Sequence, residues 1–408
     1  YMAELAREFA LPEPRAGYRS AELLLPLLPD ARRADRAGVL ASWSDRALLD
    51  EILEVIHGRV LTSVDAYVET NRRGRGRGLD RARQRPALWA VHERLRAACD
   101  RRGVAPWDAL PARIAAHLEA RPAASPRFGA VVIDEAQDLL PSIFRVVLAL
   151  QAGRDENLLV LGDAAQNVYR SGFRWGHTGL RPAAGQVTHL RRCFRSTPSI
   201  VGAAAPLLAR QQRRFEGDLV LPEGDGEAGP PVHVRTYRCV EAELESVAEE
   251  VGIRIENGVP PSSIAVLIDD AEHRAALGRH LDTLDCAWED FRKDRRERRI
   301  DIFDQSVKLL GVASAKGIEF QVVFVPLVTE ASFPAADDDG ESADRARRML
   351  YTAMTRCAWE LRLSAHGAAP SGLLAELDPA HVVWEGASGL VGASMPSGLR
   401  SGLETVSA

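Results

Sequence analysis

The amino-acid sequence predicts an α/β protein with parallel sheets, and three observations lead to this fold class. Val131–Ile133 and Leu158–Leu161 are short apolar runs, as expected of strands that are buried on both faces of a parallel sheet. Residues 139–150, which lie between these runs, place apolar side chains at helical spacing and predict a helix that faces the sheet. Further along, residues 232–234 and 264–268 read as strands on either side of a helix at residues 241–255.

Composition limits the classes of protein to which the chain can belong. Its 408 residues suggest two or three domains, and its content of 46% hydrophobic and 27% charged residues is that of a soluble globular protein. No run approaches the roughly 18 apolar residues of a membrane span, and no secretory signal opens the chain. The five cysteines form no CxxC pair, which argues against structural zinc and favours a reducing, cytoplasmic setting. The net charge of −5 excludes a uniformly basic nucleic-acid binder but not a local basic groove.

The first 120 residues are expected to form helices and loops. Ser44 or Asp45 can cap the helix that contains the apolar run at residues 48–53. A basic, glycine-rich loop at residues 72–78 suits phosphate contacts, which are electrostatic and insensitive to sequence. Only three of the 52 basic residues are lysine, a coding bias that makes a solvated loop without a ligand an equally good interpretation. The candidate DNA contacts in this loop are Arg72, Arg73, Arg75 and Arg77.

Polar residues follow both predicted strands at the edge of the sheet where ligands bind in open α/β folds. Asp134 and Glu135 come directly after the first strand. A carboxylate there can hold Mg²⁺ against nucleotide phosphates, and a second can orient an attacking water. An isolated Asp-Glu pair is more often a solvated turn, so the signal comes from the apolar run before it. The second strand runs into Gly162, Asp163 and, three residues later, Gln166.

Five segments together resemble motifs II to VI of the UvrD/Rep-like superfamily 1 DNA helicases, in the family's order and spacing. Val131–Asp138 resembles motif II, the Walker B element, and residues 162–169 resemble motif III, GDxxQxxY. Residues 190–197 resemble motif IV, the Ser-x-Lys-Gly-x-Glu-Phe core at residues 314–320 resembles motif V, and residues 347–357 resemble motif VI. The resemblance covers roughly residues 125 to 365.

The resemblance implies two RecA-like domains of the P-loop NTPase type, with ATP at their interface and single-stranded DNA across the top. Residues 1–182 are expected to form the remainder of the first domain (1A), with a helical 1B-like insertion at about 58–120. Residues 183–384 are expected to form the second domain (2A), followed by a flexible Gly- and Ser-rich tail at 385–408. The interval of about 110 residues between motifs IV and V leaves room for little or no 2B subdomain.

The motifs also imply a role for each of their polar residues. Asp134 would hold Mg²⁺ and Glu135 would act as the general base, while Gln166, Arg195 and Arg356 would contact the γ-phosphate. The other implied nucleotide contacts are Phe194, which would stack on adenine, Gly317, and Glu319, which would contact the ribose. The implied DNA contacts outside the basic loop are Tyr169, Trp175, Ser314 and Lys316.

The sequence departs from the family pattern in three motifs. Ser171 stands where an aromatic often stacks on a base, although Phe173 and Trp175 are close by, and either ring can instead be structural. Cys193 replaces the asparagine of motif IV, so that local hydrogen bond is lost. In motif V, Gly311 and Ala313 replace a threonine and a histidine that serve DNA contact and coupling, which argues against robust unwinding.

A phosphate-cradling loop, GxxxxGK[ST], accompanies none of the three lysines. We expect that the chain is truncated upstream, that a partner supplies the loop, or that the motor is degenerate; the first residue, Tyr1, favours truncation. The implied function is ATP-dependent translocation on single-stranded or partly duplex DNA in repair, recombination or defence. Family analogy gives 3′-to-5′ polarity. A nuclease is a candidate protein partner, and no membrane is expected. The alternative is a non-hydrolysing DNA-binding or scaffold subunit.

Overall fold

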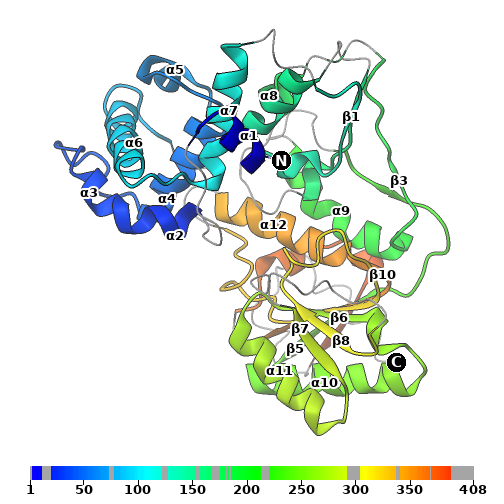
Figure 1. The fold of residues 1–408 in the computed structure, drawn as a ribbon. Coiled ribbons are helices and arrows are strands. Elements are labelled where there is room, and N and C mark those ends of the chain that lie inside the picture. The colour runs from blue at the N-terminus through cyan, green and yellow to red at the C-terminus, as the bar shows by residue number, and fades with distance from the viewer. Residues whose placement is uncertain are drawn as a thin grey trace. The chain divides into compact units, whose positions relative to one another are not determined.

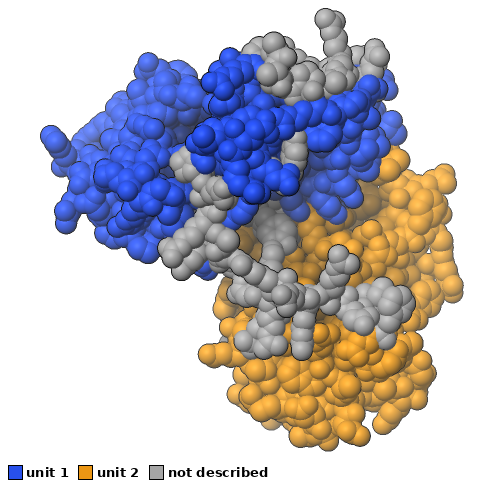
Figure 2. Space-filling model, in the orientation of Figure 1, with its two compact units in different colours: residues 1–164, 170–188 blue, residues 165–169, 189–408 orange. Residues whose placement is uncertain are grey.

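The chain forms two compact units, which are described separately. The computed structural model describes residues 2–11, 20–72, 78–121, 127–151, 157–166, 175–180, 182, 185–212, 220–291, 304–336, 341–367 and 369–386. Unit 1 comprises residues 1–164 and 170–188, and unit 2 comprises residues 165–169 and 189–408 (Figure 2). The segment 165–169, which follows the second predicted strand, therefore belongs to unit 2.

Unit 1 consists mainly of helices, as the sequence predicted for most of residues 1–118 (Figure 1). Ser44 caps α4, because its Oγ accepts a hydrogen bond from Ala47 N at 3.2 Å, so the cap is Ser44 and not Asp45. A π-helix, η2 (Glu51–His57), follows α4 directly. The α-helices of the unit are α1 (Met2–Glu8), α2 (Ser20–Leu24), α3 (Leu28–Arg32), α4 (Asp45–Asp50), α5 (Val64–Glu69), α6 (Gln84–Arg101), α7 (Leu110–Glu119) and α8 (Pro141–Leu150).

One continuous apolar core joins the helices from α2 to α6. It runs from Leu24 to Cys99 and includes Tyr67 and Leu88, both fully buried. The helices before residue 58 therefore share their core with α5 and α6, which lie in the predicted 1B-like insertion. A second cluster is formed by α1, α7 and α8.

The sheet of unit 1 contains two strands in the described part of the chain, β1 (Val131–Ile133) and β2 (Leu158–Val160). They pair in parallel with Val131 opposite Leu158, which confirms both predicted strands and their relative direction. The buried Phe144 of α8 packs against Ile133 on one face of this sheet, as the apolar stripe of that helix predicted.

The prediction that these strands are buried on both faces was wrong. Val132 is 66% exposed and Leu159 is 52% exposed, so their side chains form an exposed apolar face opposite α8. The physical reason is that, among the described residues, no second layer packs on this side of β1 and β2. An apolar run predicts a strand from its composition, but burial depends on what the rest of the protein places against each face.

Unit 2 is built on a seven-stranded parallel sheet in the order β11-β5-β10-β9-β6-β8-β7. Its strands are β5 (Val232–Tyr237), β6 (Ile264–Leu267), β7 (Trp288–Phe291), β8 (Val307–Leu310), β9 (Phe320–Val325), β10 (Cys357–His366) and β11 (Val382–Gly386). Its helices are α9 (Pro198–Gln212), α10 (Val240–Glu256), α11 (Ala271–Thr283) and α12 (Glu341–Met354). Two short strands, β3 (Arg192–Cys193) and β4 (Glu223–Gly224), pair in parallel outside this sheet. The sheet confirms the predicted α/β class.

Both faces of this sheet are covered by helices. Helices α10 and α11 pack on the face that carries Ile264, Val266 and Phe324, and α9 and α12 pack against the other face (Figure 1). The four residues of β6 are all buried, as expected of a strand between two helical layers. Strand β11 ends at Gly386, so the first two residues of the predicted tail belong to the sheet, and residues 387–408 lie outside the described residues.

Within the described segments of the chain, no helix combines the length and the apolar character that crossing a bilayer requires.

Candidate functional site

The carboxyl end of β1 presents two exposed carboxylates. Glu135 has a left-handed backbone (φ 51°, ψ 39°), a conformation that is uncommon for a residue with a Cβ atom. Asp134 Oδ1 accepts a hydrogen bond from Glu135 N at 2.8 Å, and Ala136 N donates to Leu161 O at 3.0 Å. The chain therefore turns sharply at Glu135, directly after the strand, and leaves both acidic side chains at the surface.

These two side chains suit a magnesium ion. Mg²⁺ prefers oxygen ligands and is commonly held by one or two carboxylates together with substrate phosphates and waters. Asp134 and Glu135 supply exposed carboxylate oxygens at the strand end. The described part of the chain contains no group of three or more His, Cys, Asp or Glu residues that could enclose a metal on its own. Two exposed carboxylates therefore fit an ion whose remaining ligands are waters or substrate oxygens.

Gln137 is a site residue that the sequence reasoning missed. Its side chain is 1% exposed, its Nε2 donates to Glu135 Oε2 at 2.6 Å, and its Oε1 accepts from Asp163 N at 2.9 Å. The side chain thus joins the segment after β1 to the segment after β2. The signal available in the sequence was an amide two residues after the acidic pair, and amides are too common for this to be specific.

Gly162 is required by the same arrangement. A Cβ atom at this position would lie 2.9 Å from Gln137 Oε1 and 2.9 Å from the Trp175 ring. Trp175 begins the short helix η8 (Trp175–His177) and packs against the apolar cluster around Ile133. The structural interpretation of Trp175 therefore has direct support, and its contact with DNA stays a prediction. Tyr169 and Phe173 lie outside the described residues.

Three predicted site residues meet in unit 2 around Gln166. Arg356 Nη2 donates to Gln166 Oε1 at 2.9 Å, and Lys316 Nζ donates to the Gln166 carbonyl at 3.0 Å. The Arg356 side chain is fully buried, and its Nε also donates to the carbonyl of Thr352 at 3.1 Å. Lys316 and Arg356, which are 150 and 190 positions away in the sequence, thus hold the backbone carbonyl and the side-chain amide of Gln166.

Lys316 was predicted to contact DNA, and the structure gives it a protein partner. Its ammonium group binds the last carbonyl of the short helix η7 (Ala164–Gln166). A second contact to a DNA phosphate stays a prediction. Ser314, the other predicted DNA contact of this motif, lies in the turn closed by the hydrogen bond from Ser314 N to Gly311 O at 2.9 Å.

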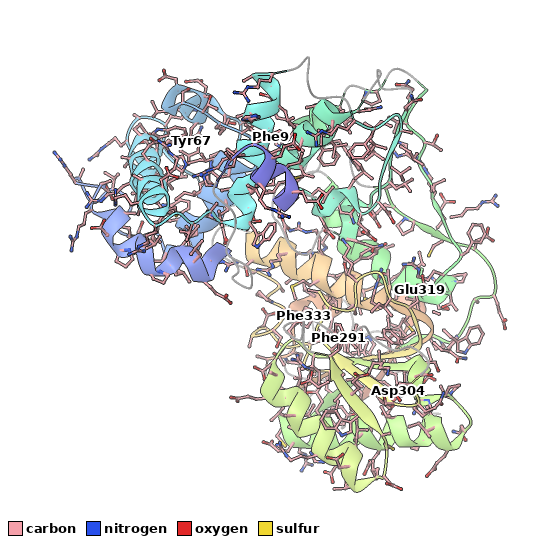
Figure 3. All side chains as sticks on the ribbon, in the orientation of Figure 1. Phe9, Tyr67, Phe291, Asp304, Glu319 and Phe333 are labelled. Carbon is pink, nitrogen blue, oxygen red and sulfur yellow. The ribbon has the colours of Figure 1, made fainter. Side chains whose placement is uncertain are left out.

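Arg195 and Glu319 form an ion pair within unit 2 (Glu319 is labelled in Figure 3). Their side chains are 39% and 47% exposed, so both remain accessible to a ligand. Phe194 is 77% exposed, as a ring that stacks on a base must be. Ser196 holds this segment in place, because its Oγ donates to the carbonyl of Cys357 at 2.7 Å. Arg195 and Glu319, which are both expected at the nucleotide, thus form a pair, and Arg195 directly follows the exposed Phe194 in the chain.

The thiol of Cys357, the residue after Arg356, takes no part in the chemistry proposed below. It is buried, and burial raises its pKa to about 12. A thiol with such a pKa stays protonated at neutral pH and is a poor nucleophile or metal ligand.

Asp269 occupies the space left by the glycine of motif V. A Cβ atom at Gly311 would lie 2.7 Å from Asp269 Oδ1, and the same oxygen accepts from Val312 N at 2.9 Å. Asp269 follows β6, so its carboxylate braces the loop after β8 from the neighbouring strand. The sequence reasoning missed this residue, since nothing near it in the sequence resembles a motif. Gly317, further along the same loop, has a φ of +82°, which explains why glycine is needed there.

The structure corrects the prediction that Arg72 contacts DNA. Its Nε and Nη2 donate to the two carboxylate oxygens of Glu51 at 2.7 and 2.9 Å, and the two side chains are 6% and 2% exposed. The hydroxyl of Tyr67, which is labelled in Figure 3, donates to the same carboxylate at 3.0 Å. Burial raises the pKa of Tyr67, so its hydroxyl stays protonated as a donor. Arg72 is therefore committed to the core, and Arg73, Arg75 and Arg77 lie outside the described residues.

Comparisons with known proteins agree with these observations. Residues 68–179 match the UvrD/REP helicase N-terminal domain, and residues 291–368 match the UvrD-like helicase C-terminal domain. The chain is 30% identical over 251 residues to the ATP-dependent DNA helicase UvrD2 of Mycobacterium tuberculosis (strain H37Rv), covering 58% of this chain and 35% of the relative. It is 24% identical over 243 residues to a probable DNA helicase of Mycoplasma pneumoniae, covering 55% and 41%. The matched part of the chain thus covers less than half the length of each of these two relatives.

Proposed function

Because the chain belongs to the UvrD/Rep-like family of superfamily 1 helicases, with its RecA-like α/β fold, we propose that the whole protein is an ATP-dependent DNA helicase or translocase. In this proposal it moves on single-stranded DNA with 3′-to-5′ polarity and acts in DNA repair, recombination or defence. Unit 1 is assigned to the first RecA-like domain with its helical insertion, and unit 2 to the second.

The observation that carries the proposal is the buried contact between Arg356 and Gln166. A fully buried guanidinium is costly unless its donors are satisfied, and here one of them is aimed at a side-chain amide. Both residues are expected at the γ-phosphate, and Lys316 holds the backbone at the same point. Three motifs that are far apart in the sequence thus converge on one residue, as an assembled nucleotide sensor requires.

The proposed chemistry divides between named side chains. Glu135 accepts a proton from the attacking water, and its position at the end of β1 makes it accessible for this role. Arg195 and Arg356 neutralise negative charge that develops on the transferred phosphoryl group. Asp134 would hold Mg²⁺, which supplies charge neutralisation on the phosphate oxygens when it is bound. Phe194 offers its exposed ring to the adenine, and the accessible Glu319 side chain contacts the ribose.

The decisive test is Glu135→Gln in the full-length protein. The variant should keep nucleotide binding but lose at least about a hundredfold in ATP turnover stimulated by single-stranded DNA, because a positioned general base contributes about that much. Nucleotide binding is measured by calorimetry and turnover by phosphate release. Glu93→Gln, on the exposed surface of α6, is the matched control and should leave turnover unchanged. Near-normal turnover in Glu135→Gln would contradict the proposal.

One observation favours the alternative of a non-hydrolysing DNA-binding or scaffold subunit. The motif V loop carries Gly311 braced by the Asp269 carboxylate, in place of a threonine that serves DNA contact in the family. Without that threonine, the motif V loop lacks a side chain that couples bound DNA to ATP turnover in the family. This alternative predicts single-strand binding without ATP turnover in the wild-type protein, and the same phosphate-release assay distinguishes it from an active motor.

A further inference from the structure

We propose that Gln137 is a positioning residue that orients the carboxylate of Glu135 by tying it to the backbone of Asp163. This inference rests on the proposed function, because it assigns a partner to the proposed general base. It is carried by three observations in unit 1. These are the two hydrogen bonds of the Gln137 amide, its burial to 1% exposure, and the lack of space for a side chain at Gly162.

The chemistry of the two partners fixes the orientation of the Gln137 amide. An ionised carboxylate can only accept hydrogen bonds, and a backbone N–H can only donate. The amide nitrogen must therefore face Glu135, at 2.6 Å, and the amide oxygen must face Asp163 N, at 2.9 Å. A primary amide carries a donor and an acceptor on one planar group, and the glutamine side chain spans these two partners. The glutamine amide thus satisfies both partners at once.

The bridge has a consequence for the proposed base. Glu135 is exposed at the end of β1, and an exposed carboxylate side chain without restraint can adopt several rotamers. The bond from Gln137 holds Oε2 and thereby limits rotation of the carboxylate, which sets the direction of Oε1. A general base must lie within hydrogen-bond reach of the proton that it removes, and a misplacement of about 1 Å can cost about a hundredfold in rate. The buried amide therefore keeps an exposed base in one orientation.

The other end of the bridge links the base to the loop after β2. Asp163 lies directly after Gly162 and three residues before Gln166. A Cβ atom at Gly162 would lie 2.9 Å from both the Gln137 amide and the Trp175 ring. These two side chains therefore pack directly against the backbone of the loop at Gly162. The amide of Gln137 thus anchors Glu135 to the segment that leads to the proposed phosphate sensor.

The first experiment measures ATP turnover of the full-length Gln137→Met variant with single-stranded DNA. Methionine keeps the length of the side chain and removes both hydrogen bonds. We expect kcat to fall at least about tenfold, while KM for ATP and the affinity for single-stranded DNA stay unchanged. In the Glu135→Gln background the same substitution should change kcat by less than about twofold, since no base remains to be oriented. Equal loss in both backgrounds would overturn the positioning role.

Gln84→Met is the matched control. Its amide also makes two hydrogen bonds, accepting from Asp80 N at 3.0 Å and donating to Val39 O at 3.2 Å, but it touches no proposed site residue. It should leave kcat unchanged. A tenfold loss of kcat in Gln84→Met would show that removing any such amide from unit 1 impairs turnover, and this would overturn the specific role of Gln137.

A second experiment does not depend on activity. We expect the sum of the melting-temperature losses of Gln137→Met and Glu135→Ala to be larger than the loss of the double variant. The reason is that both substitutions remove the same hydrogen bond. Additive losses would show that the bridge does not exist in solution and would overturn the inference whatever the turnover. If the losses in the variants are non-additive but the wild-type protein shows no ATP turnover, the proposed function is overturned. The bridge between Gln137 and Glu135 is then still supported.

Discussion

At the scale of single residues, Arg72 shows how burial changes the role of a charged side chain. The sequence places it at the start of a basic loop, but its guanidinium forms two hydrogen bonds with a carboxylate that is 2% exposed. The adjacent loop residues give no hint of this, because the partner Glu51 lies 21 positions earlier. Composition alone cannot distinguish an arginine committed to the core from one that is available for phosphate.

We expect Arg72→Met to lower the stability of unit 1 strongly. Removing one partner of a buried ion pair leaves an uncompensated charge, which typically costs about 3–5 kcal/mol. Arg81→Met is the matched control, because Arg81 and Glu69 form a pair with side chains that are 59% and 73% exposed. Such a pair contributes under about 1 kcal/mol. Denaturant unfolding of both variants measures the difference.

A second substitution tests the cause of this loss. Arg72→Met combined with Glu51→Gln should recover part of the stability, since the neutral amide removes the unpaired charge and can still accept from Tyr67. At a temperature where Arg72→Met is folded, the salt dependence of its single-strand binding should match the wild type. A flatter salt dependence in Arg72→Met would show that Arg72 contacts a DNA phosphate and would contradict this expectation.

At the scale of elements, the loop after β8 shows how a departure from a family pattern is accommodated. Gly311 lacks the side chain that motif V usually has there, and Asp269 from the end of β6 fills the space and accepts from Val312 N. Strands β6 and β8 are neighbours in the sheet, so Asp269 after β6 lies next to Gly311 after β8. The sequence could show only the departure, because pairing of β6 with β8 is a property of the folded sheet.

We expect that restoring the family residue will be harmful here. Gly311→Thr places a Cβ atom 2.7 Å from Asp269 Oδ1, and overpacking of this kind typically costs about 1–3 kcal/mol. The double variant Gly311→Thr with Asp269→Ala should melt at a higher temperature than Gly311→Thr alone. Gly129→Thr is the control, since a Cβ atom there meets nothing within 4 Å. An unchanged melting temperature in Gly311→Thr would show that the loop moves aside freely.

At the scale of the whole molecule, the sequence predicted the fold class and the main elements of both units. The apolar run at residues 264–268 gave β6 directly, because buried parallel strands exclude polar residues. The apolar run Val131–Ile133 also gave a strand, although one face of β1 is exposed. The motifs also singled out Gln166, Lys316 and Arg356, and these three residues meet in unit 2. The contacts made by Gln137, Asp269 and Arg72 could not be predicted, because each depends on a partner that is distant in sequence.

The exposed apolar face of β1 and β2 affects how the 408-residue chain behaves when it is produced alone. Val132 and Leu159 offer branched side chains to water on a short sheet, a combination that favours association between copies. We expect the apparent mass in light scattering to rise with protein concentration, and Val132→Lys to reduce this rise without lowering the melting temperature. A constant mass at every concentration would contradict this expectation. Handling at low concentration, or with a polar residue at position 132, is therefore the practical route to measurements on this chain.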